Sequence, residues 1–318
     1  MTAIRCGAAV AALAIGGISL GAGDAPAIEL RAMHAPGSAA EDGRSETAGQ
    51  ASAVTFRTRS VESLKRLFDG LGFDLSAVPK GMPVPRVLVF ELPAGLKAMK
   101  PVRHRTRMFR KILLPLVLRS NESILRERER LLALKRKMQI GLALAVEESG
   151  WLWALAHDYR VRDADLETLI RRVDVIPPSL ALAQAIEESG WGTSAYARKG
   201  NAIFGQETLL TARNGMTGSY RGRRFKIKTF ESLLEAVEAY ARNLNTHPAY
   251  RSMREERAMM RARGEQPGGH LLAGTLLRYS ERGPAYIRTI RTIMGNFGLR
   301  NLDGAELEAG TTIHVIER

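Results

Sequence analysis

Two consecutive prolines and a glycine bracket the helix that most constrains how this chain can fold. Pro177-Pro178 precedes an Ala- and Leu-rich segment, and Gly190 follows that segment directly. Proline fits the first turn of a helix because its missing N–H would have no partner there. Glycine adopts the left-handed conformation that ends many helices. We therefore predict a helix over Ser179–Ser189, with Glu188 in its last turn.

Helical periodicity extends over most of the remaining chain. Apolar residues recur at helical spacing in segments 60–71, 103 to about 150, 163–172, 232–244, 249–263, 271–279 and 285–297. Pro115 is a point at which the second of these helices could be interrupted. A Gly- and Arg-rich stretch around Tyr220–Ile227 predicts a small β-hairpin, and Thr311–Ile316 predicts one short strand. We expect a mainly α fold of the α+β class.

The N-terminus has the three parts of a secretory signal. Met1–Arg5 contains one positive charge, Cys6–Gly23 is an uncharged apolar run, and Ala25-Pro26-Ala27 offers small residues for cleavage. The alternative interpretation of this segment is a permanent membrane anchor. We expect cleavage and export to the periplasm or cell envelope.

The composition further along the chain indicates its domain organisation. Residues 34–52 are rich in Ala, Gly and Ser and lack apolar periodicity, which is typical of a flexible linker. The predicted parts are a signal peptide (1–27), a linker (28–53), an N-terminal mostly helical extension (54–138), a main domain (139–302) and a C-terminal tail (303–318).

The net charge of +14 over 318 residues indicates attraction to a polyanion, such as nucleic acid, anionic lipid or an anionic polymer of the cell envelope. Aromatic residues make up only 6% of the chain, and there is no Cys/His finger spacing, so we do not expect nucleic acid as a partner. Cys6 is the single cysteine, and the six histidines are scattered. The sequence therefore predicts neither a metal site nor a cofactor.

Glu188 has the surroundings expected of a catalytic acid. Cleavage of a glycosidic bond needs a carboxyl group that keeps its proton near neutral pH. An aromatic neighbour such as Trp191 and the C-terminal end of a helix dipole both disfavour the ionised form. The same five residues, Glu-Glu-Ser-Gly-Trp, also occur at Glu147–Trp151, where an ordinary apolar helix continues. The short motif alone is therefore weak evidence.

The residues after the second copy are more specific. Gly192-Thr193-Ser194 comes directly after it, and Gly200–Gly205 has the sequence Gly-Asn-Ala-Ile-Phe-Gly. The run Pro178–Gly205 resembles the catalytic helix and following loop of bacterial N-acetylglucosaminidases of the flagellar-muramidase type. The resemblance implies a lysozyme-like helical domain, a glycan substrate and Glu188 as general acid. It also implies substrate-binding roles for Trp191, Ser194, Asn201, Phe204 and Gly205.

Further segments resemble the Bax group of bacterial proteins, which have a mannosyl-glycoprotein endo-beta-N-acetylglucosaminidase-like domain. These segments are residues 83–86, 112–116, 230–250 and 279–286, and the likeness covers roughly Phe56 to Leu302. Tyr279 and Tyr286 match the family's tyrosine-containing segment. The resemblance implies that either tyrosine could orient the substrate's N-acetyl group or stabilise the transition state.

The second catalytic group is not evident. Relatives often place a second Glu in the hairpin, but no Asp or Glu occurs here between Glu207 and Glu231, so Glu207 is the nearest candidate. Inverting hydrolysis needs a second carboxylate about 6.5–9.5 Å from the acid, and retaining hydrolysis one at about 5–5.5 Å. Without either, the substrate's N-acetyl group could act as the nucleophile.

The expected function is that of a peptidoglycan hydrolase that cleaves the glycan strand after N-acetylglucosamine. Two alternatives remain open: a lytic transglycosylase that uses the same Glu188, and a non-catalytic wall-binding module. The expected partners are peptidoglycan strands and, through the basic surface, anionic envelope polymers. A membrane is expected as a partner only if the signal is uncleaved.

Overall fold

The computed structural model describes residues 53–220 and 222–316. The predicted signal peptide and the predicted linker up to residue 52 lie outside these residues. Helices predominate in the described part of the chain, and the mainly α, α+β class is confirmed. No helix in this part is long and apolar enough to span a membrane.

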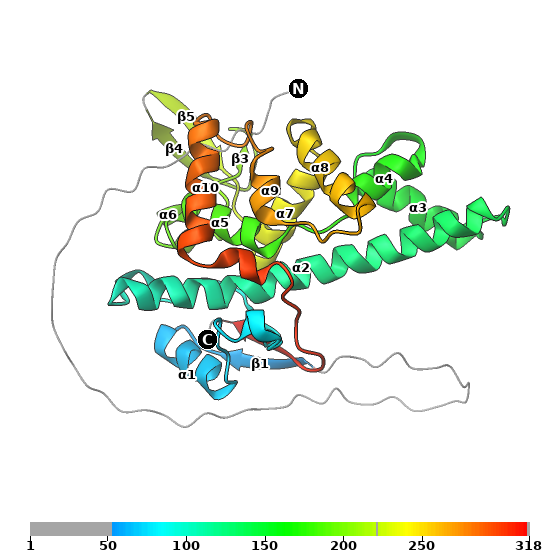
Figure 1. Cartoon of the computed structure of the whole chain (residues 1–318). Helices are drawn as coiled ribbons and strands as arrows, with labels where there is room; N and C mark the ends of the chain where they lie inside the picture. Colours follow the sequence, from blue (N-terminus) through cyan, green and yellow to red (C-terminus); the bar gives the residue numbers. More distant parts are fainter. Residues whose placement is uncertain (1–52, 221, 317–318) are drawn as a thin grey trace, which may run out of the picture.

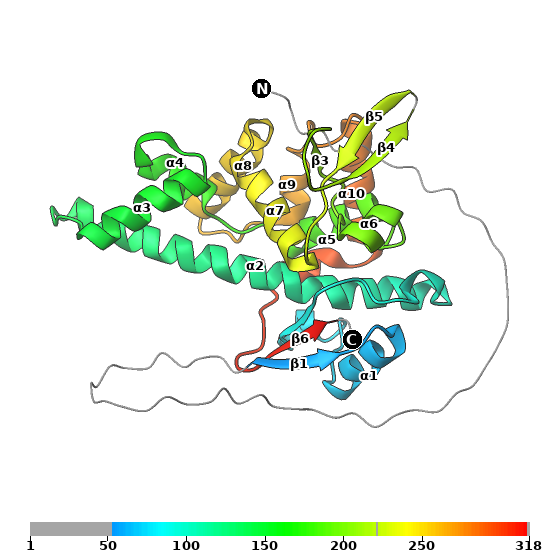
Figure 2. The same cartoon turned by 180° about the vertical axis from the view of Figure 1, so that it is seen from behind.

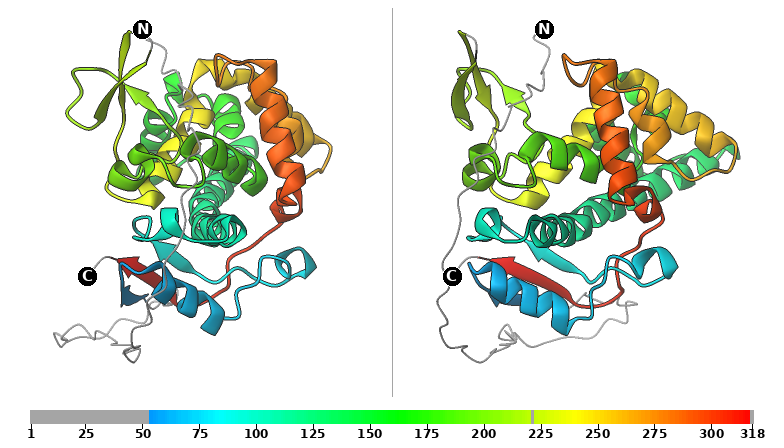
Figure 3. Two further views of the ribbon diagram at one scale, coloured as in Figure 1. Left: turned by 90° about the vertical axis from the view of Figure 1, so that its left-hand side faces the viewer. Right: turned by 60° about the vertical axis from the view of Figure 1, so that its left-hand side comes forward.

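The longest element is α2 (Val102–Gln139), a helix of 38 residues that runs across the whole molecule (Figure 1). It divides the structure into two layers, with a small sheet on one side and the other large helices on the opposite side (Figure 3). Pro115 lies inside this helix without ending it. The predicted helical stretch to about residue 150 is interrupted after α2 and not at Pro115, because α2 ends before Gly141, whose φ of 79° is left-handed. A separate helix, α3 (Val146–Asp158), comes next.

The helical layer contains the predicted segments with small changes of their ends. Its other helices are α4 (Leu166–Arg172), α5 (Pro178–Ser189), α6 (Ala195–Gly200), α7 (Leu233–Thr246), α8 (Arg251–Ala262), α9 (Gly269–Ala273) and α10 (Pro284–Asn296). Short 3-10 turns η3 (Arg162–Ala164), η4 (Pro248–Tyr250) and η5 (Leu299–Leu302) connect them. The helix predicted over 271–279 is only the short α9.

The layer on the other side of α2 is a three-stranded parallel sheet. The predicted strand at Thr311–Ile316 is confirmed as one of its strands, but the pairing of the three strands was not predicted from the sequence. The strand order of the sheet is β1 (Ala53–Arg57), β6 (Thr312–Ile316), β2 (Val87–Val89). The C-terminal strand is therefore central, and Val315 pairs with Phe56 on one side and Val89 on the other. Helix α1 (Val61–Gly70) and the 3-10 turns η1 (Val78–Lys80) and η2 (Leu96–Ala98) complete this layer. The pairing joins the two ends of the described chain, as Figure 2 shows for β1 and β6.

The second sheet is the predicted hairpin, and its presence is confirmed. It consists of β3 (Glu207–Thr208), β4 (Met216–Tyr220) and β5 (Arg223–Ile227), antiparallel in the order β3-β5-β4. The hairpin extends from the helical layer beside α6 and α10 (Figure 1).

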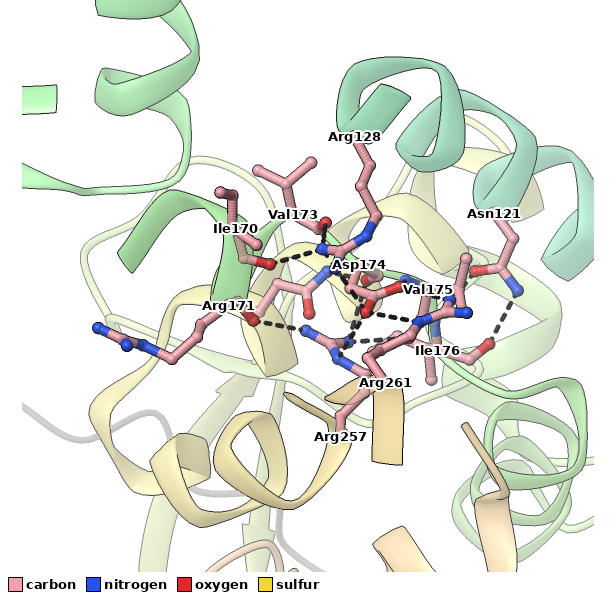
Figure 4. A network of polar contacts seen from close by, with 11 residues as sticks. Asn121, Arg128, Ile170, Arg171, Val173, Asp174, Val175, Ile176, Arg257 and Arg261 are labelled. Carbon is pink, nitrogen blue, oxygen red and sulfur yellow. Dashed lines mark hydrogen bonds and ion pairs between the residues drawn. The ribbon is translucent and has the colours of Figure 1, made fainter. Parts of the chain in front are cut away.

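A buried ionic network fixes the chain just before α5 (Figure 4). Asp174 is 2% exposed, and its carboxylate lies 2.9 Å from Arg261, 3.6 Å from Arg128 and 3.9 Å from the 1% exposed Arg257. Burial alone would raise the pKa of Asp174, but the positive charges of Arg257 and its neighbours outweigh burial and lower it. Arg257 also donates to the carbonyl groups of Asp174 and Val175. The network therefore holds the entry to α5 in a single geometry.

Candidate active site at the end of helix α5

Helix α5 begins at Pro178, one residue before the predicted start, and ends as predicted at Ser189, with Glu188 in its last turn. Pro178 occupies its first turn, and Gly190 comes directly after it with a left-handed φ of 57°. Asp303 caps its beginning, accepting hydrogen bonds from the backbone N–H and the hydroxyl of Ser179 at 2.8 and 2.9 Å. The prolines, the glycine and this remote carboxylate together fix where Glu188 lies.

The small residues after Glu188 form a tight turn into α6. Ser189 Oγ donates to the carbonyl of Ala185 at 2.6 Å and accepts from the backbone N–H of Gly192 at 2.8 Å. Gly192 has a φ of 72°, and a Cβ there would lie 3.0 Å from the side chains of Leu92 and Phe109. The turn therefore requires glycine, and it packs directly against α2 and the chain after β2.

The carboxyl group of Glu188 is enclosed by protein. The residue keeps some accessible surface, but burial of the carboxyl group raises its pKa to about 8. A hydrogen bond from Tyr286 and the charge of Arg282 lower the pKa, and the nearby Glu187 raises it; neither lowering effect offsets burial. At neutral pH the carboxyl group is therefore mostly protonated, which is the state that a general acid needs.

A chain of buried hydrogen bonds leads to this carboxyl group. The hydroxyl of Tyr240 donates to Oε1 of Gln184 at 2.7 Å, and Nε2 of Gln184 donates to Oη of Tyr286 at 3.0 Å. The hydroxyl of Tyr286 then donates to Oε1 of Glu188 at 2.9 Å. These residues come from α5, α7 and α10, so the site requires all three helices. Neither Gln184 nor Tyr240 was predicted from the sequence, although Gln184 is a polar residue on the apolar helix, one turn before Glu188.

Aromatic stacking holds both tyrosines of the hydrogen-bond chain, Tyr240 and Tyr286, in place. Phe204 lies parallel to Tyr240 with ring centroids 3.8 Å apart, and Tyr279 stacks on Tyr286 at 5.4 Å. Two predicted site residues, Tyr279 and Phe204, therefore contact the site through Tyr286 and Tyr240. Gly205 lies at the other oxygen of the acid, because a Cβ there would be 3.5 Å from Oε2 of Glu188.

Three other predicted site residues have evident packing or capping contacts. The ring of Trp191 packs edge-to-face with Phe297 at 4.6 Å and with Phe109 of α2 at 6.3 Å. Ser194 caps α6 by accepting from the backbone N–H of Ala197 at 3.1 Å. Asn201 ends α6 in the left-handed conformation, and its side chain donates to the carbonyls of Phe230 and Glu231. These contacts fix the loop between the acid and the hairpin.

Glu207, the predicted second carboxylate, lies on strand β3. Its side chain is 11% exposed and makes a 2.6 Å ion pair with Arg223 of β5. The neighbouring strands β3 and β5 are paired, so this ion pair crosses the hairpin sheet. The structure thus places one candidate carboxylate on the hairpin and the other at the end of α5.

In the first copy of the motif, the second glutamate lies at the beginning of a helix and not at its end. Glu148 lies in the first turn of α3, where it accepts from Lys137 at 2.7 Å and from the backbone N–H of Ala145 at 2.8 Å. Those two hydrogen bonds lower its pKa, whereas burial raises the pKa of Glu188. Gly150 is an ordinary helical residue. Identical pentapeptides thus give one ionised surface carboxylate and one protonated buried acid.

Two cavities of about 360 Å³ occur elsewhere, one between α2 and the entry to α5 and one between α2 and α7. Neither is lined by Glu188. Among residues 53–220 and 222–316, no group of three or more His, Cys, Asp or Glu residues could hold a metal ion.

Comparison with known proteins gives a family match over the segment that contains this site. Residues 164–299 match the glucosaminidase family model, described as mannosyl-glycoprotein endo-beta-N-acetylglucosaminidase. Protein bax of Escherichia coli (strain K12) is 34% identical over 188 residues. The match covers 57% of this chain and 66% of that protein, just under two thirds of its length.

Two solved structures are also similar. The catalytic domain of the autolysin Auto from Listeria monocytogenes is 16% identical, with a TM-score of 0.33, over 54% of this chain and 96% of that domain. A C-terminally truncated glycoside hydrolase domain of FlgJ from Salmonella typhimurium is 22% identical, with a TM-score of 0.28, over 39% of this chain and 84% of that domain. The family assignment rests on the sequence matches: residues 164–299 are a glucosaminidase-family domain, in a chain that is similar to protein bax.

Proposed function

We propose that this protein is an endo-β-N-acetylglucosaminidase that cleaves the glycan strand of peptidoglycan after N-acetylglucosamine, with Glu188 as general acid. The observation that supports this most directly is the enclosed carboxyl group of Glu188, whose pKa is raised to about 8. The family match over residues 164–299 supports the glycan as the substrate class. Peptidoglycan lies outside the cytoplasmic membrane, so the proposal includes export, in agreement with the N-terminal pattern.

The hydrogen-bond chain supports a placement of the proton on one oxygen of the acid. Because Gln184 accepts from Tyr240, its NH₂ group faces Tyr286, and Tyr286 must in turn donate to Glu188. Oε1 of Glu188 is therefore an acceptor, and the proton of the neutral acid resides on Oε2. Oε2 is the oxygen beside Gly205, where a Cβ would have only atoms of Glu188 within 4 Å. The glycosidic oxygen should approach Glu188 from this side.

The chemical step depends on the placement of the proton on Oε2 of Glu188. The proton on Oε2 transfers to the glycosidic oxygen while the bond from that oxygen to the anomeric carbon breaks, and the bonding electrons leave with the oxygen. The sugar becomes oxocarbenium-like, and Glu188 becomes a carboxylate that Tyr286 stabilises through its hydrogen bond. Water then adds to the anomeric carbon and loses a proton. The carboxylate of Glu207 accepts this proton if it acts as general base; if the oxygen of the substrate's N-acetyl group has first bonded to the anomeric carbon, water displaces that oxygen and the Glu188 carboxylate accepts the proton.

The raised pKa favours a catalytic role over a wall-binding module. Enclosing a carboxyl group against its hydration destabilises a fold, and a module that only binds glycan needs no such group. A lytic transglycosylase would use the same acid but would form an anhydro sugar instead of adding water. The products therefore distinguish the two enzymatic reactions.

The experiment is a comparison of muropeptides released from purified peptidoglycan by the wild type, by Glu188→Gln and by Glu148→Gln. The last variant changes the same residue in the other copy of the motif and is the matched control. We expect products with a reducing-end N-acetylglucosamine from the wild type and from Glu148→Gln, and none from Glu188→Gln. Anhydro-sugar products would assign the transglycosylase reaction, and undiminished activity of Glu188→Gln would refute the proposal.

A further inference from the structure

The turn between α2 and α3 has an unusual concentration of exposed apolar side chains. We call residues 138–153 the α2–α3 tip. Val146 and Ile140, at 83% and 73% exposed, are the two most exposed large apolar side chains in the described part of the chain. Trp153, Leu142 and Met138 are 58%, 55% and 44% exposed. This end of α2 projects beyond the other helices (Figures 1 and 2), so the tip is convex and accessible.

The backbone of the turn already satisfies its own hydrogen bonds. The N–H groups of Ile140, Gly141 and Leu142 donate to carbonyls of the last turn of α2. The bonds from Gly141 to Met138 and from Leu142 to Lys137, with Gly141 at φ 79°, form a Schellman motif. A turn of this kind can enter an apolar layer without leaving those N–H groups unpaired.

The outer face of α3 continues the apolar surface. Val146, Gly150 and Trp153 recur at helical spacing and lie on one face. Leu152 and Leu155 on the opposite face are buried against the protein. The exposed stripe of α3 from Val146 to Trp153 is therefore apolar, and tryptophan favours the boundary between lipid and water. The exposed His157 and Asp158 follow this stripe in the last turn of α3.

Basic residues flank this apolar surface. Lys135-Arg136-Lys137 immediately precede it, and the guanidinium of Arg130 lies over the ring of Trp151. Lys135 and Lys137 form ion pairs with Glu167 and Glu148, whereas Arg136 is exposed. Glu147 is the exposed acidic residue of the tip. Residues 138–153 themselves contain Glu147 and Glu148 and no basic residue, so the positive charge comes from the flank. With Arg130, Lys135, Arg136 and Lys137 included, segment 130–153 has four basic and two acidic residues and a net charge of +2.

We propose that the α2–α3 tip docks onto an anionic lipid bilayer, with Ile140, Val146 and Trp153 in the interfacial layer and the basic residues at the headgroups. A convex apolar tip with basic flanks fits a deformable lipid surface, which closes around side chains that project outward. Anionic headgroups complement the positive charge. This attachment is additional to any that an uncleaved N-terminal segment would provide, and it does not depend on the proposed enzymatic activity.

The first test is co-sedimentation of the full chain with phosphatidylcholine vesicles that contain about one third phosphatidylglycerol. The triple variant Ile140→Ser, Val146→Ser, Trp153→Ser should partition at least about tenfold more weakly than the wild type. Its matched control replaces Met259, Leu271 and Leu277 by Ser. These residues are 49%, 52% and 53% exposed on other elements, and the control should partition as the wild type does.

The charge contribution is tested separately. Arg136→Gln should weaken binding to the anionic vesicles about fivefold, because one basic residue near such a surface contributes on the order of 1 kcal/mol. Equally strong binding to pure phosphatidylcholine vesicles would overturn the proposal. So would concentration-dependent dimerisation that the triple variant abolishes, because the tip would then contact a second copy of the chain.

A local probe separates the tip from the apolar N-terminal run. In a Cys6→Ser background, an environment-sensitive dye is attached at Ile140→Cys or, as a control, at Leu271→Cys. On anionic vesicles the dye at position 140 should move to an apolar environment and be quenched by lipid-borne quenchers, and the dye at 271 should remain in water. The same response from both positions, or from neither, would contradict docking by the tip even if the protein binds the vesicles.

Discussion

The hydroxyl of Tyr286 donates a 2.9 Å hydrogen bond to Oε1 of Glu188, although the two residues lie 98 positions apart in the chain. Helix α10 packs against α5 to bring them together. The bond favours the carboxylate form of the acid, whereas burial favours the neutral form. The site therefore combines an environment that keeps the proton with a partner that stabilises the charge left after the proton has been transferred.

Tyr286→Phe should separate these two effects. Loss of the hydrogen bond removes an influence that lowers the pKa of Glu188, so the pKa should rise and the high-pH limb of kcat/KM should move to higher pH. The maximum rate should fall about tenfold to a hundredfold, because hydrogen bonds to charged groups contribute about 1.5–3 kcal/mol. Tyr196→Phe is the control, because that ring contacts Phe225 on the hairpin. A rate loss with an unmoved limb would contradict the assignment.

The pH dependence of stability should also identify Glu188. Because the folded-state pKa is about 8 against an ordinary 4.5, the unfolded chain loses this proton first as the pH rises. The contribution of Glu188 to stability therefore falls between these values and levels off above about pH 8. Glu188→Gln removes the effect and should raise the free energy of unfolding near pH 7 by roughly 3 kcal/mol, with little gain near pH 4. Denaturant unfolding at the two pH values measures this, and an equal change at both would contradict the raised pKa.

Gln184 should act as a positioning residue. Gln184→Met keeps the buried volume but removes the amide that orients Tyr286, so we expect a lower kcat, a nearly unchanged KM and a shifted high-pH limb. Tyr240→Phe retains the ring that stacks on Phe204 and removes only the hydroxyl at the far end of the hydrogen-bond chain. Its effects on kcat and on the high-pH limb should therefore be smaller and in the same direction. If Gln184→Met lowers the melting temperature but leaves the pH profile unchanged, the residue has a structural role only.

The sequence predicted the parts of the site that depend on local chemistry. The prolines before α5 and Gly190 after it determine the helix, and the helix determines the position of Glu188. Gln184 and Tyr240 were missed because their importance comes from contacts between α5, α7 and α10, and periodicity in one segment does not reveal a hydrogen bond to another.

The parallel sheet was missed for a similar reason. Its central strand, β6, pairs with β1 and β2, so each strand has its partners far away in the sequence. The strand at Thr311–Ile316 was predicted, but a short apolar run considered singly does not reveal which strands it pairs with. The hairpin was predicted because its strands are neighbours in the chain.

Replacing the glycine by alanine should have opposite effects on stability in the two copies of Glu-Ser-Gly-Trp. Gly190 has a φ of 57°, and a Cβ there would lie 3.3 Å from Thr193, so Gly190→Ala should destabilise the fold by about 1 kcal/mol or more. Gly150 lies inside α3, and a Cβ there would have nothing within 4 Å, so Gly150→Ala should stabilise by about 0.5–1 kcal/mol. Urea unfolding of both variants measures the difference. Changes of the same sign would show that the two glycines do not differ in conformation as described.

Asp174→Asn should be among the most destabilising conservative substitutions in this chain. The change leaves Arg257, which is 1% exposed, and its neighbours Arg128 and Arg261 without the negative charge they surround. Breaking a buried ionic network by removing one partner typically costs about 3–5 kcal/mol.

Because the same segment leads into α5, the variant should also lose activity before it unfolds globally, as the end of α5 becomes less well positioned. Activity and far-UV circular dichroism are followed together in increasing urea, with Asp69→Asn on the surface of α1 as the control. Coincident loss of the two signals would indicate that the network supports the whole fold and not α5 in particular.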